Sequence, residues 1–317
     1  MSATARKRMA ILLAAYNGAA YLPQQLDSLF AQTDQDWDLL ISDDCSRDET
    51  PGILRAYAAR YPDRIRLIDH DAPTGSSQNN FMLLTRQAGD YDYLMYCDQD
   101  DVWNPDKVAQ TLQKMRETEN GQRDVPCLVH TDLTVVDERL NVKNESFFYS
   151  SMLRADRCQL HYLLIQNIVT GCTMMINHAL WELAVLPAEE GAMRMHDGWF
   201  ALIAAALGRI GFVERPTMRY RQHGGNVVGA SDVRSVRYIA AALGRLKKNR
   251  QSILDTQRQA GALAHTLGDR LGKEQRNLLT GYANLHARGK LGRLRFVARN
   301  RIWLLGWRRK LAEIMLI

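Results

Sequence analysis

The stretch YLMYCDQDDVW, residues 93–103, joins an apolar run to three aspartates that lie within four positions. Carboxylates repel one another, so a folded chain gains nothing by crowding three of them at the end of a buried strand. A solvated acidic turn that caps the helix expected near Asn104 is the alternative, but a helix cap needs one carboxylate. We therefore expect Asp98, Asp100 and Asp101 to hold a ligand or a cation.

Apolar runs before and after this stretch predict the rest of the sheet. The runs expected to form strands are MAILLAAYNG (9–18), WDLLISDD (37–44), RIRLIDH (64–70) and YDYLMYC (91–97). Segments with helical spacing of leucines separate them, and this alternation predicts an α/β fold with a parallel, doubly wound sheet. Ligands of such sheets bind beyond the carboxyl ends of the strands. The turns at 16–18, 43–44 and 98–101 are therefore expected to meet in one site.

Charge divides the chain into two parts. Residues 245–317 contain 17 Lys and Arg but 4 Asp and Glu, a net charge of +13, which leaves 24 basic and 31 acidic residues, or −7, for residues 1–244. From Val236 onward the pattern is helical and basic. We predict an α/β domain over residues 1–235, which contains the candidate site, and a basic helical region over residues 236–317.

Composition and missing motifs exclude several classes. Five scattered cysteines without a C-x-x-C pair argue against a zinc site or a disulfide framework and are expected to be small buried residues. The first strand and turn do not fit G-x-G-x-x-G, and no Walker A motif, G-x-S-x-G or H-E-x-x-H occurs. Clustered carboxylates suit hard divalent cations. A nucleoside diphosphate neutralised by a metal is the expected ligand.

Together the motifs resemble the inverting GT-A glycosyltransferases of family 2. The resemblance rests on AAYNG, SDDCSRDET, DQDD and HDGW, and the further motifs CDQDDVW, HTDL, TGCTM and RQHGGN are similar to those of bacterial rhamnosyltransferase-like members. These motifs occur in the family order over roughly residues 8 to 230. The resemblance implies a Rossmann-like, mostly parallel sheet flanked by helices.

The resemblance also implies roles for single residues. Asp197 matches the catalytic base. The residues that match a nucleotide-sugar site are Ala15, Tyr16, Asn17, Asp43, Asp44, Gly75, Asn79, Asp98, Gln99, Arg221 and His223. Asp100, Asp98 and His223 match ligands of Mn²⁺ or Mg²⁺, with Asp100 as the favoured direct ligand. The acceptor or sugar side is expected at Asp101, Trp103, Thr170, His196 and Trp199.

Structural alternatives remain open for several of these residues. Asp197 could only cap its helix, His223 could be a surface histidine, and Trp103 and Trp199 could simply belong to the core. Either Asp43 or Asp44 could accept from the imide N–H of a uracil or thymine. Asn80 is an alternative to Asn79.

The basic end, LRFVARNRIWLLGWRRKLAEIMLI, interleaves Arg and Lys with large apolar residues. Such a segment fits an amphipathic helix on an anionic membrane, and a solvated basic face is the alternative. Nucleic acid is disfavoured because the acidic part of the chain would repel phosphates and no binding motif occurs. We expect a cytoplasmic protein at the inner face of the cell membrane, bound peripherally.

The sequence favours transfer of a sugar, with inversion, from a nucleotide-diphosphate donor to a hydroxyl of a growing, lipid-linked bacterial surface glycan. From the resemblance, dTDP-L-rhamnose is the first choice of donor, and a UDP-hexose or another deoxysugar nucleotide is the second. Nucleotidyl transfer would need a Gly-rich basic loop after the first strand, which AAYNGAAYLPQQ lacks. A non-catalytic, membrane-associated scaffold that binds nucleotide sugars is the alternative from another class.

Overall fold

The computed structural model describes residues 6–189, 191–223 and 246–304, and it divides into two compact units. Unit 1 comprises Met1–Phe147, Thr170–Val185 and Gly211–Gly229, and unit 2 comprises Phe148–Val169, Leu186–Ile210 and Ala230–Ile317. The chain thus passes between the units several times. The sequence-based division at residue 235 is a different kind of boundary and stays a prediction.

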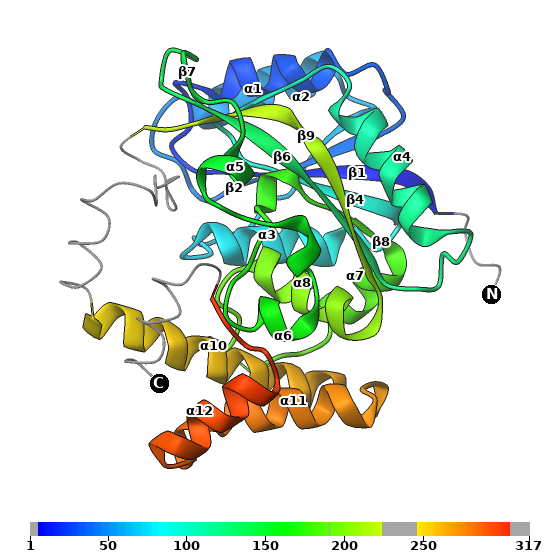
Figure 1. The fold of residues 1–317 in the computed structure, drawn as a ribbon. Helices are drawn as coiled ribbons and strands as arrows, with labels where there is room; N and C mark the ends of the chain where they lie inside the picture. The colour runs from blue at the N-terminus through cyan, green and yellow to red at the C-terminus, as the bar shows by residue number, and fades with distance from the viewer. Residues whose placement is uncertain (1–5, 190, 224–245, 305–317) are drawn as a thin grey trace. The chain divides into compact units, whose positions relative to one another are not determined.

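Unit 1 is built on a sheet whose first half is parallel (Figure 1). Its strands are β1 (Lys7–Ala15), β2 (Asp38–Asp43), β3 (Ile65–Leu67) and β4 (Tyr91–Cys97), in the spatial order β3-β2-β1-β4. In the register of the pairs, Ala15 lies opposite Asp43, and Leu13 lies opposite Cys97. The ends of β1, β2 and β4 therefore lie at one edge of the sheet, as the sequence predicted.

The helices of unit 1 follow from the connections between these strands. Helices α1 (Leu22–Phe30) and α2 (Thr50–Arg60) lie on one side of the parallel strands, and α3 (Ser77–Gln87) lies on the other (Figure 1). Right-handed crossovers produce this arrangement, because β1, β2 and β3 step in one direction and β4 returns to the far side of β1. Side chains of β1 such as Ile11 and Leu12 are 0% exposed between the two helical layers. Each burial of this kind contributes about 1.5–3 kcal/mol.

Beyond β4 the sheet becomes antiparallel, so the sheet as a whole is mixed. The remaining strands are β5 (Val102–Trp103), β6 (Cys127–Val136), β7 (Val142–Asn144), β8 (Met175–Asn177) and β9 (Arg209–Arg221). Strand β8 lies between β4 and β6 and is antiparallel to both, and β5 pairs antiparallel with β9. Antiparallel pairs need no crossover helix, so this half of the sheet lacks the alternation of strands and helices that predicted the first half. Helices α4 (Lys107–Glu119) and α7 (His178–Ala184) pack against this region.

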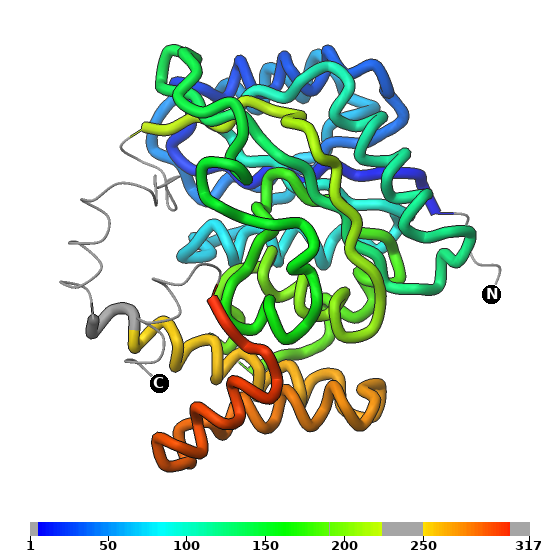
Figure 2. Tube along the Cα trace, viewed as in Figure 1, coloured from blue at the N-terminus to red at the C-terminus, as the bar shows by residue number. Residues whose placement is uncertain are grey.

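The regular elements in the described part of unit 2 are helices, apart from the beginning of β9. Its elements include the short helices η1 (Ala155–Arg157) and α6 (Leu160–Leu163), then α8 (His196–Leu207), α10 (Leu246–Leu267), α11 (Lys273–Ala283) and α12 (Lys290–Arg299). The traces of α10 and α11 run side by side (Figure 2). Tyr282 of α11 joins them by a 2.8 Å hydrogen bond to the hydroxyl of Thr256.

The basic C-terminal region is helical where it is described. Residues 224–245 and 305–317, which contain the GGN loop and most of the basic end, lie outside the described residues. Two apolar residues of this end, Val297 and Ile302, are 0% exposed within unit 2, whereas Leu291 is 84% exposed. No helix among the described residues has the length and apolarity needed to span a membrane. Peripheral binding to a membrane stays a prediction.

The cysteines are free thiols. Cys97, Cys127 and Cys172 are buried as expected, but Cys45 is exposed. Cys45 follows β2 with a φ of 62°, and Cys158 is partly exposed, so the expectation of burial was wrong for these two cysteines.

Candidate active site

The side chain of Gln99, which follows β4, forms hydrogen bonds with the backbone of Tyr16, which follows β1. The amide of Gln99 accepts from Tyr16 N at 2.8 Å and donates to Tyr16 O at 2.9 Å. Gly18 makes the contact possible, because a Cβ on this residue would lie 2.2 Å from Oε1 of Gln99. Two predicted site residues, Tyr16 and Gln99, thus form one rigid unit at the strand ends.

The end of β2 is an acidic turn that reaches to β1. Asn17, whose φ is 47°, donates its backbone N–H to Ser46 Oγ at 2.7 Å, and that hydroxyl donates to Asp43. Asp44 is 8% exposed and accepts from the backbone N–H of Thr74 at 2.5 Å. Both aspartates therefore have protein donors and lie at the same edge of the sheet as Asn17.

The loop before α3 is held against β2. Gly75 has a φ of 84°, a conformation that favours glycine, and Asn79 donates to Thr74 O at 2.8 Å. The neighbouring Asn80 is buried and donates to Ser42 O at 3.1 Å. Asn79, which is exposed, is the one of the two asparagines whose side chain a ligand could reach.

Two of the three predicted metal ligands, Asp100 and His223, lie in contact after β4 and β9. Nε2 of His223 lies 2.7 Å from Oδ2 of Asp100, and the two side chains are 16% and 15% exposed. The His223 ring also packs on Tyr21, with ring centroids 4.8 Å apart. Asp98, two residues before Asp100, is partly exposed. Asp100 and His223, which are 123 positions apart in sequence, thus lie in contact, and their binding of one ion stays a prediction.

A second set of ligands includes a residue that the sequence did not single out. Asp98, Asp101 and Cys172 place their ligand atoms within 4.8 Å of one another. Asp101 is fully buried, and burial together with repulsion from Asp100 and Asp98 raises its carboxyl pKa well above the ordinary value. Burial, together with the charges of Asp101 and Asp98, raises the pKa of the Cys172 thiol well above its ordinary value.

The donor chemistry therefore fits a hard divalent cation. Carboxylate oxygens of Asp98 and Asp100 with the imidazole of His223 suit Mn²⁺ or Mg²⁺ better than the set with a thiol does. These side chains come from the end of β4 and the residues after β9. Asp101 is better described as the buried neighbour that accepts from the backbone of Arg221 at 3.0 Å.

Arg221 organises this corner. Its side chain is 2% exposed, and Nε donates to Asp100 O at 2.8 Å. The two terminal nitrogens donate to Glu138 O and to Gln24 Oε1, both at 2.5 Å, and the guanidinium lies 4.6 Å from the centroid of the Tyr21 ring. Arg221, which was predicted to contact the nucleotide sugar, thus donates these hydrogen bonds to protein acceptors in this structure. It joins α1, the acidic stretch and the loop after β6.

The buried Lys107 near the acidic stretch was not singled out from the sequence. Lys107 is 0% exposed, with Nζ 3.3 Å from Thr217 Oγ1 and 4.7 Å from the centroid of the Trp103 ring. Burial lowers the pKa of its amine to about 8. Position 107 follows Asn104-Pro105-Asp106 at the start of a helix, where a lysine is expected to be solvated. Nothing local in the sequence indicates its burial.

The predicted catalytic base belongs to unit 2. Asp197 is half-buried in the first turn of α8, and its Oδ1 accepts from Gly198 N at 2.5 Å. His196 beside it is buried, which lowers its pKa to about 3 and keeps the ring neutral. The negative charge of Asp197 is also favoured by the positive end of the helix dipole.

Several predicted site residues contribute to packing. Ala15, Trp103 and Trp199 are at most 2% exposed within their units, and Thr170 is half-buried with its carbonyl accepting from Thr173. Trp103 and Trp199 thus lie in the core, which was the alternative considered for them. Roles for these residues toward a sugar stay predictions.

Comparisons with known proteins place the fold and the family. Staphylococcus aureus TarS, solved as residues 1–349 in complex with UDP-GlcNAc, aligns with a TM-score of 0.56 and 15% identity over 93% of this chain and 88% of that one. The mannosyltransferase PcManGT from Pyrobaculum calidifontis, solved with GDP-Man and Mn²⁺, aligns with a TM-score of 0.52 and 19% identity over 93% and 74%. These similarities show a GT-A fold, a mixed sheet flanked by helices with a helical C-terminal region.

The sequence model of Glycosyl transferase family 2 matches residues 10–183, more than half of the chain, and the protein belongs to this family. The dTDP-rhamnosyl transferase RfbG of Shigella flexneri is 26% identical over 249 residues, which cover 76% of this chain and 82% of that protein. The resemblance to family 2 and to its rhamnosyltransferases is therefore confirmed. The Asp98–Asp101 stretch, which could hold a metal ion, lies inside the matched region.

Proposed function

We propose that the protein is a metal-dependent, inverting glycosyltransferase that moves L-rhamnose from dTDP-L-rhamnose to a hydroxyl of a growing bacterial surface glycan. The observation that carries the proposal is the 2.7 Å contact between Asp100 and His223, in the acidic stretch that follows β4 at the edge where β1, β2 and β4 end. Similarity to a rhamnosyl transferase over most of the chain supports the choice of donor.

The residues of unit 1 bind and orient the donor in this proposal. Asp43 or Asp44 accepts the imide N–H of the thymine, an ionised acceptor that makes the stronger bond. Asp98 and Asp100, with His223, hold Mn²⁺ or Mg²⁺, which when bound would stabilise charge on the departing diphosphate. Arg221 keeps the acidic stretch in place, because it bonds Asp100 O and the backbone after β6 together.

Asp197 of unit 2 is the proposed base. Inversion requires a carboxylate that takes the proton of the acceptor hydroxyl while the oxygen attacks the anomeric carbon from the side opposite the leaving group. Burial of the neighbouring His196 lowers the pKa of that imidazole to about 3, so the ring next to the proposed base is neutral. We further propose a lipid-linked acceptor and a peripheral location at the inner face of the cell membrane.

A screen of sugar nucleotides tests the proposal. Purified protein is incubated with dTDP-L-rhamnose, UDP-hexoses and other deoxysugar nucleotides, each with Mn²⁺, with Mg²⁺ or with EDTA, and slow hydrolysis and binding are measured. Preference for dTDP-L-rhamnose with metal, abolished by EDTA, is expected. Preference for a UDP-hexose would select the second donor. Binding of a nucleotide sugar without hydrolysis or transfer would favour the scaffold, and binding of none would refute the proposal.

A further inference from the structure

The segment around α12 carries positive charge that no acidic residue of the same segment offsets. Residues 288–301 contain five Arg and one Lys, whereas no Asp or Glu occurs between Glu274 and Glu313. Among the described residues, none of these six cations forms an ion pair, and the nearest pair in the sequence joins Arg276 to Asp269. A group of cations without carboxylate partners attracts an anionic partner.

One side of α12 is exposed and combines these cations with a leucine. Leu291, Arg295 and Arg299 are exposed and follow one another at four-residue spacing, which places them on the same side of the helix. These three residues form the α12 face. Leu291 is 84% exposed, and a single exposed leucine is ordinary on a protein surface. A leucine on the same side of a helix as two arginines without ion-pair partners is suited to a partner that is both anionic and apolar.

The apolar residues of the basic end that lie beside this face are packed into unit 2. Val297 is 0% exposed, and Phe296 lies so close to α11 that a Cβ on Gly281 would be 2.5 Å from its ring. Ile302, which follows the helix, is 0% exposed as well. Val297 and Ile302 therefore cannot enter a bilayer while α12 stays packed, so Leu291 is the apolar residue of this segment that is open to a partner.

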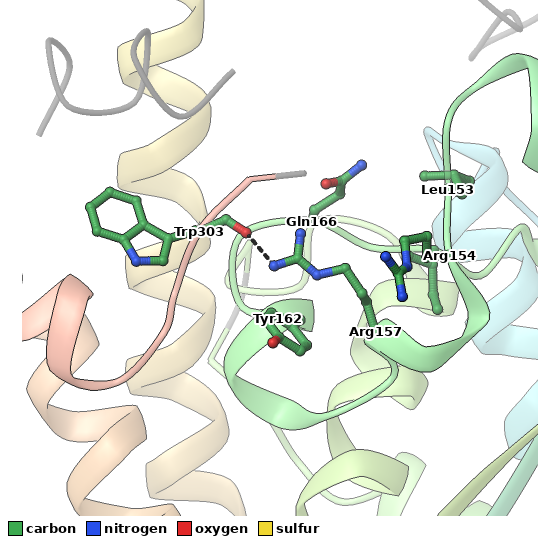
Figure 3. Close-up of a pocket in the computed structure, with 7 residues that line it drawn as sticks. Leu153, Arg154, Arg157, Tyr162, Gln166 and Trp303 are labelled. Carbon is green, nitrogen blue, oxygen red and sulfur yellow. Dashed lines mark hydrogen bonds between the residues drawn. The ribbon is translucent and has the colours of Figure 1, made fainter. Parts of the chain in front are cut away.

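A small basic pocket fastens the segment that follows α12 (Figure 3). In it, Arg157 donates to Trp303 O at 3.0 Å, and its guanidinium lies 3.9 Å from the centroid of the Tyr162 ring. Arg154 also lines the pocket and pairs with Asp156, where both side chains are 62% exposed. The cavity of about 10 Å³ has room for about one water, so it is part of the packing rather than a ligand site. The pocket thus holds the chain after α12 in place.

An anionic bilayer is the partner that matches the α12 face. Anionic headgroups attract Lys and Arg near the membrane surface, and each such residue adds to the free energy of binding. The boundary between headgroups and acyl chains also accommodates an apolar side chain. A nucleic acid offers phosphates but no apolar layer for Leu291. Arg288 and Lys290, both exposed, add positive charge at the end of the helix where Leu291 lies.

We propose that the α12 face binds the anionic surface of a lipid bilayer, with Arg295 and Arg299 at the headgroups and Leu291 at their boundary with the acyl chains. The inference rests on the peripheral location proposed above and specifies the surface that provides it. Because α12 stays packed in unit 2, binding depends mainly on charge and is weakened by salt.

Sedimentation of the full chain with vesicles tests the charge of this face. At about 0.1 M salt the protein should bind vesicles that contain phosphatidylglycerol and not vesicles of phosphatidylcholine alone, and about 0.5 M salt should release it. Replacing both Arg295→Gln and Arg299→Gln should weaken binding about ten- to fiftyfold. The matched control replaces Arg86→Gln and Arg116→Gln, two exposed arginines of α3 and α4 in unit 1, and should bind like the wild type.

Two substitutions of Leu291 test the apolar contact with opposite signs. Leu291→Gln should weaken binding to the same vesicles several-fold, because an amide gains nothing at the boundary with the acyl chains. Leu291→Trp should strengthen binding, because tryptophan favours the membrane interface. Val142→Gln, at another exposed apolar residue, is the control and should leave binding unchanged. Vesicle binding that is the same in both Leu291 variants as in the wild type would contradict the proposed contact.

The remaining outcomes separate this surface from other sources of affinity. Equal losses in the two double arginine variants would indicate adsorption by overall charge and would overturn the inference. A DNA duplex that binds more tightly than the vesicles, with no effect of Leu291→Gln, would make a nucleic acid the partner instead. Should the variant of Arg295 and Arg299 fail to fold, the two Leu291 variants still decide, because that side chain is 84% exposed.

The donor screen makes failure of this inference distinguishable from failure of the proposed function. Without vesicles, hydrolysis of the sugar nucleotide by the variant of Arg295 and Arg299 should stay at the wild-type level. An active wild type that does not bind anionic vesicles refutes the α12 face and the peripheral location alone. Vesicle binding by a wild type that neither binds nor hydrolyses any sugar nucleotide refutes the transferase and leaves the membrane surface standing.

Discussion

The acidic corner of unit 1 and the basic pocket of unit 2 hold their charged groups in different ways. In the corner, Arg221 is 2% exposed and every guanidinium nitrogen donates to the protein, whereas in the pocket the exposed Arg154 shares a solvated pair with Asp156. Removing a buried charged partner is strongly destabilising, while a solvated pair contributes little. The corner is therefore expected to be rigid and intolerant of substitution. The exposed pair of Arg154 and Asp156 is expected to tolerate substitution.

The largest expected effect separates the two carboxylates with different roles. Asp197→Asn, in unit 2, should lower transfer about a hundredfold to ten-thousandfold while donor binding stays, because an amide cannot accept the proton. Asp100→Asn, in unit 1, should lower transfer as strongly and also weaken metal-dependent donor binding, because a neutral oxygen is a poorer ligand. Transfer rates and donor affinities of both variants are measured with Mn²⁺.

Asp63→Asn is the control for these variants, because Asp63 is exposed in the turn after α2. It should behave as the wild type. Loss of donor binding in Asp197→Asn would move this residue from the role of base to that of a structural or donor-site group.

Arg221→Lys tests the rigidity of the corner. An ammonium cannot reproduce the fork that reaches Asp100 O, Glu138 O and Gln24, so the free energy of unfolding should fall by roughly 2–3 kcal/mol. Metal-dependent donor binding should weaken as well, since the acidic stretch loses its support. Chemical denaturation and donor titration measure the two effects.

Arg215→Lys is the matched control on the same strand, where the side chain is 59% exposed and pairs with Asp106. Its stability should differ from the wild type by less than about 1 kcal/mol. If both lysine variants lost the same stability, the network around Arg221 would have no special role.

Each unit contains a buried histidine whose effect on stability at low pH can be compared. Burial lowers the pKa of His130 in unit 1 and of His196 in unit 2 to about 3. The unfolded chain binds a proton near pH 6.5 that the native state refuses, so stability falls as the pH drops from 6.5 toward 3. Each histidine should cost roughly 2 kcal/mol between pH 6.5 and pH 5.

His130→Gln and His196→Gln should each flatten this decline, as followed by urea unfolding at both pH values. His265→Gln, in the last turn of α10, serves as the control because the side chain of His265 is exposed. A decline as steep in both variants as in the wild type would show that other groups cause the acid sensitivity.

The smallest effect concerns the tie between β1 and β4. Gly18→Ala brings a Cβ to 2.2 Å from Gln99 Oε1, which must move, so a loss of at least about 1 kcal/mol is expected together with weaker donor binding. Gly52→Ala in α2 meets nothing closer than 3.8 Å and should be stabilising by about 0.5–1 kcal/mol. Thermal unfolding checks the opposite signs, and a destabilised Gly52→Ala would contradict the comparison.

The sequence by itself determined the first half of the sheet and the positions of the acidic turns. Local periodicity specifies strands and helices, and alternation requires parallel strands whose ends share an edge, so Asn17, Asp43 and Asp98 could be grouped in advance. The motifs around Asp100 and Asp197 then pointed to family 2.

Only the tertiary structure decided which partners these residues meet. The antiparallel insertion of β8 between β4 and β6 brings Cys172 to Asp101, and β9 brings Arg221 to the acidic stretch from 120 positions away. Arg157 and Trp303, which are 146 positions apart, meet in the pocket of unit 2 in the same way. Such contacts depend on how whole elements pack, and local sequence patterns carry no record of that packing.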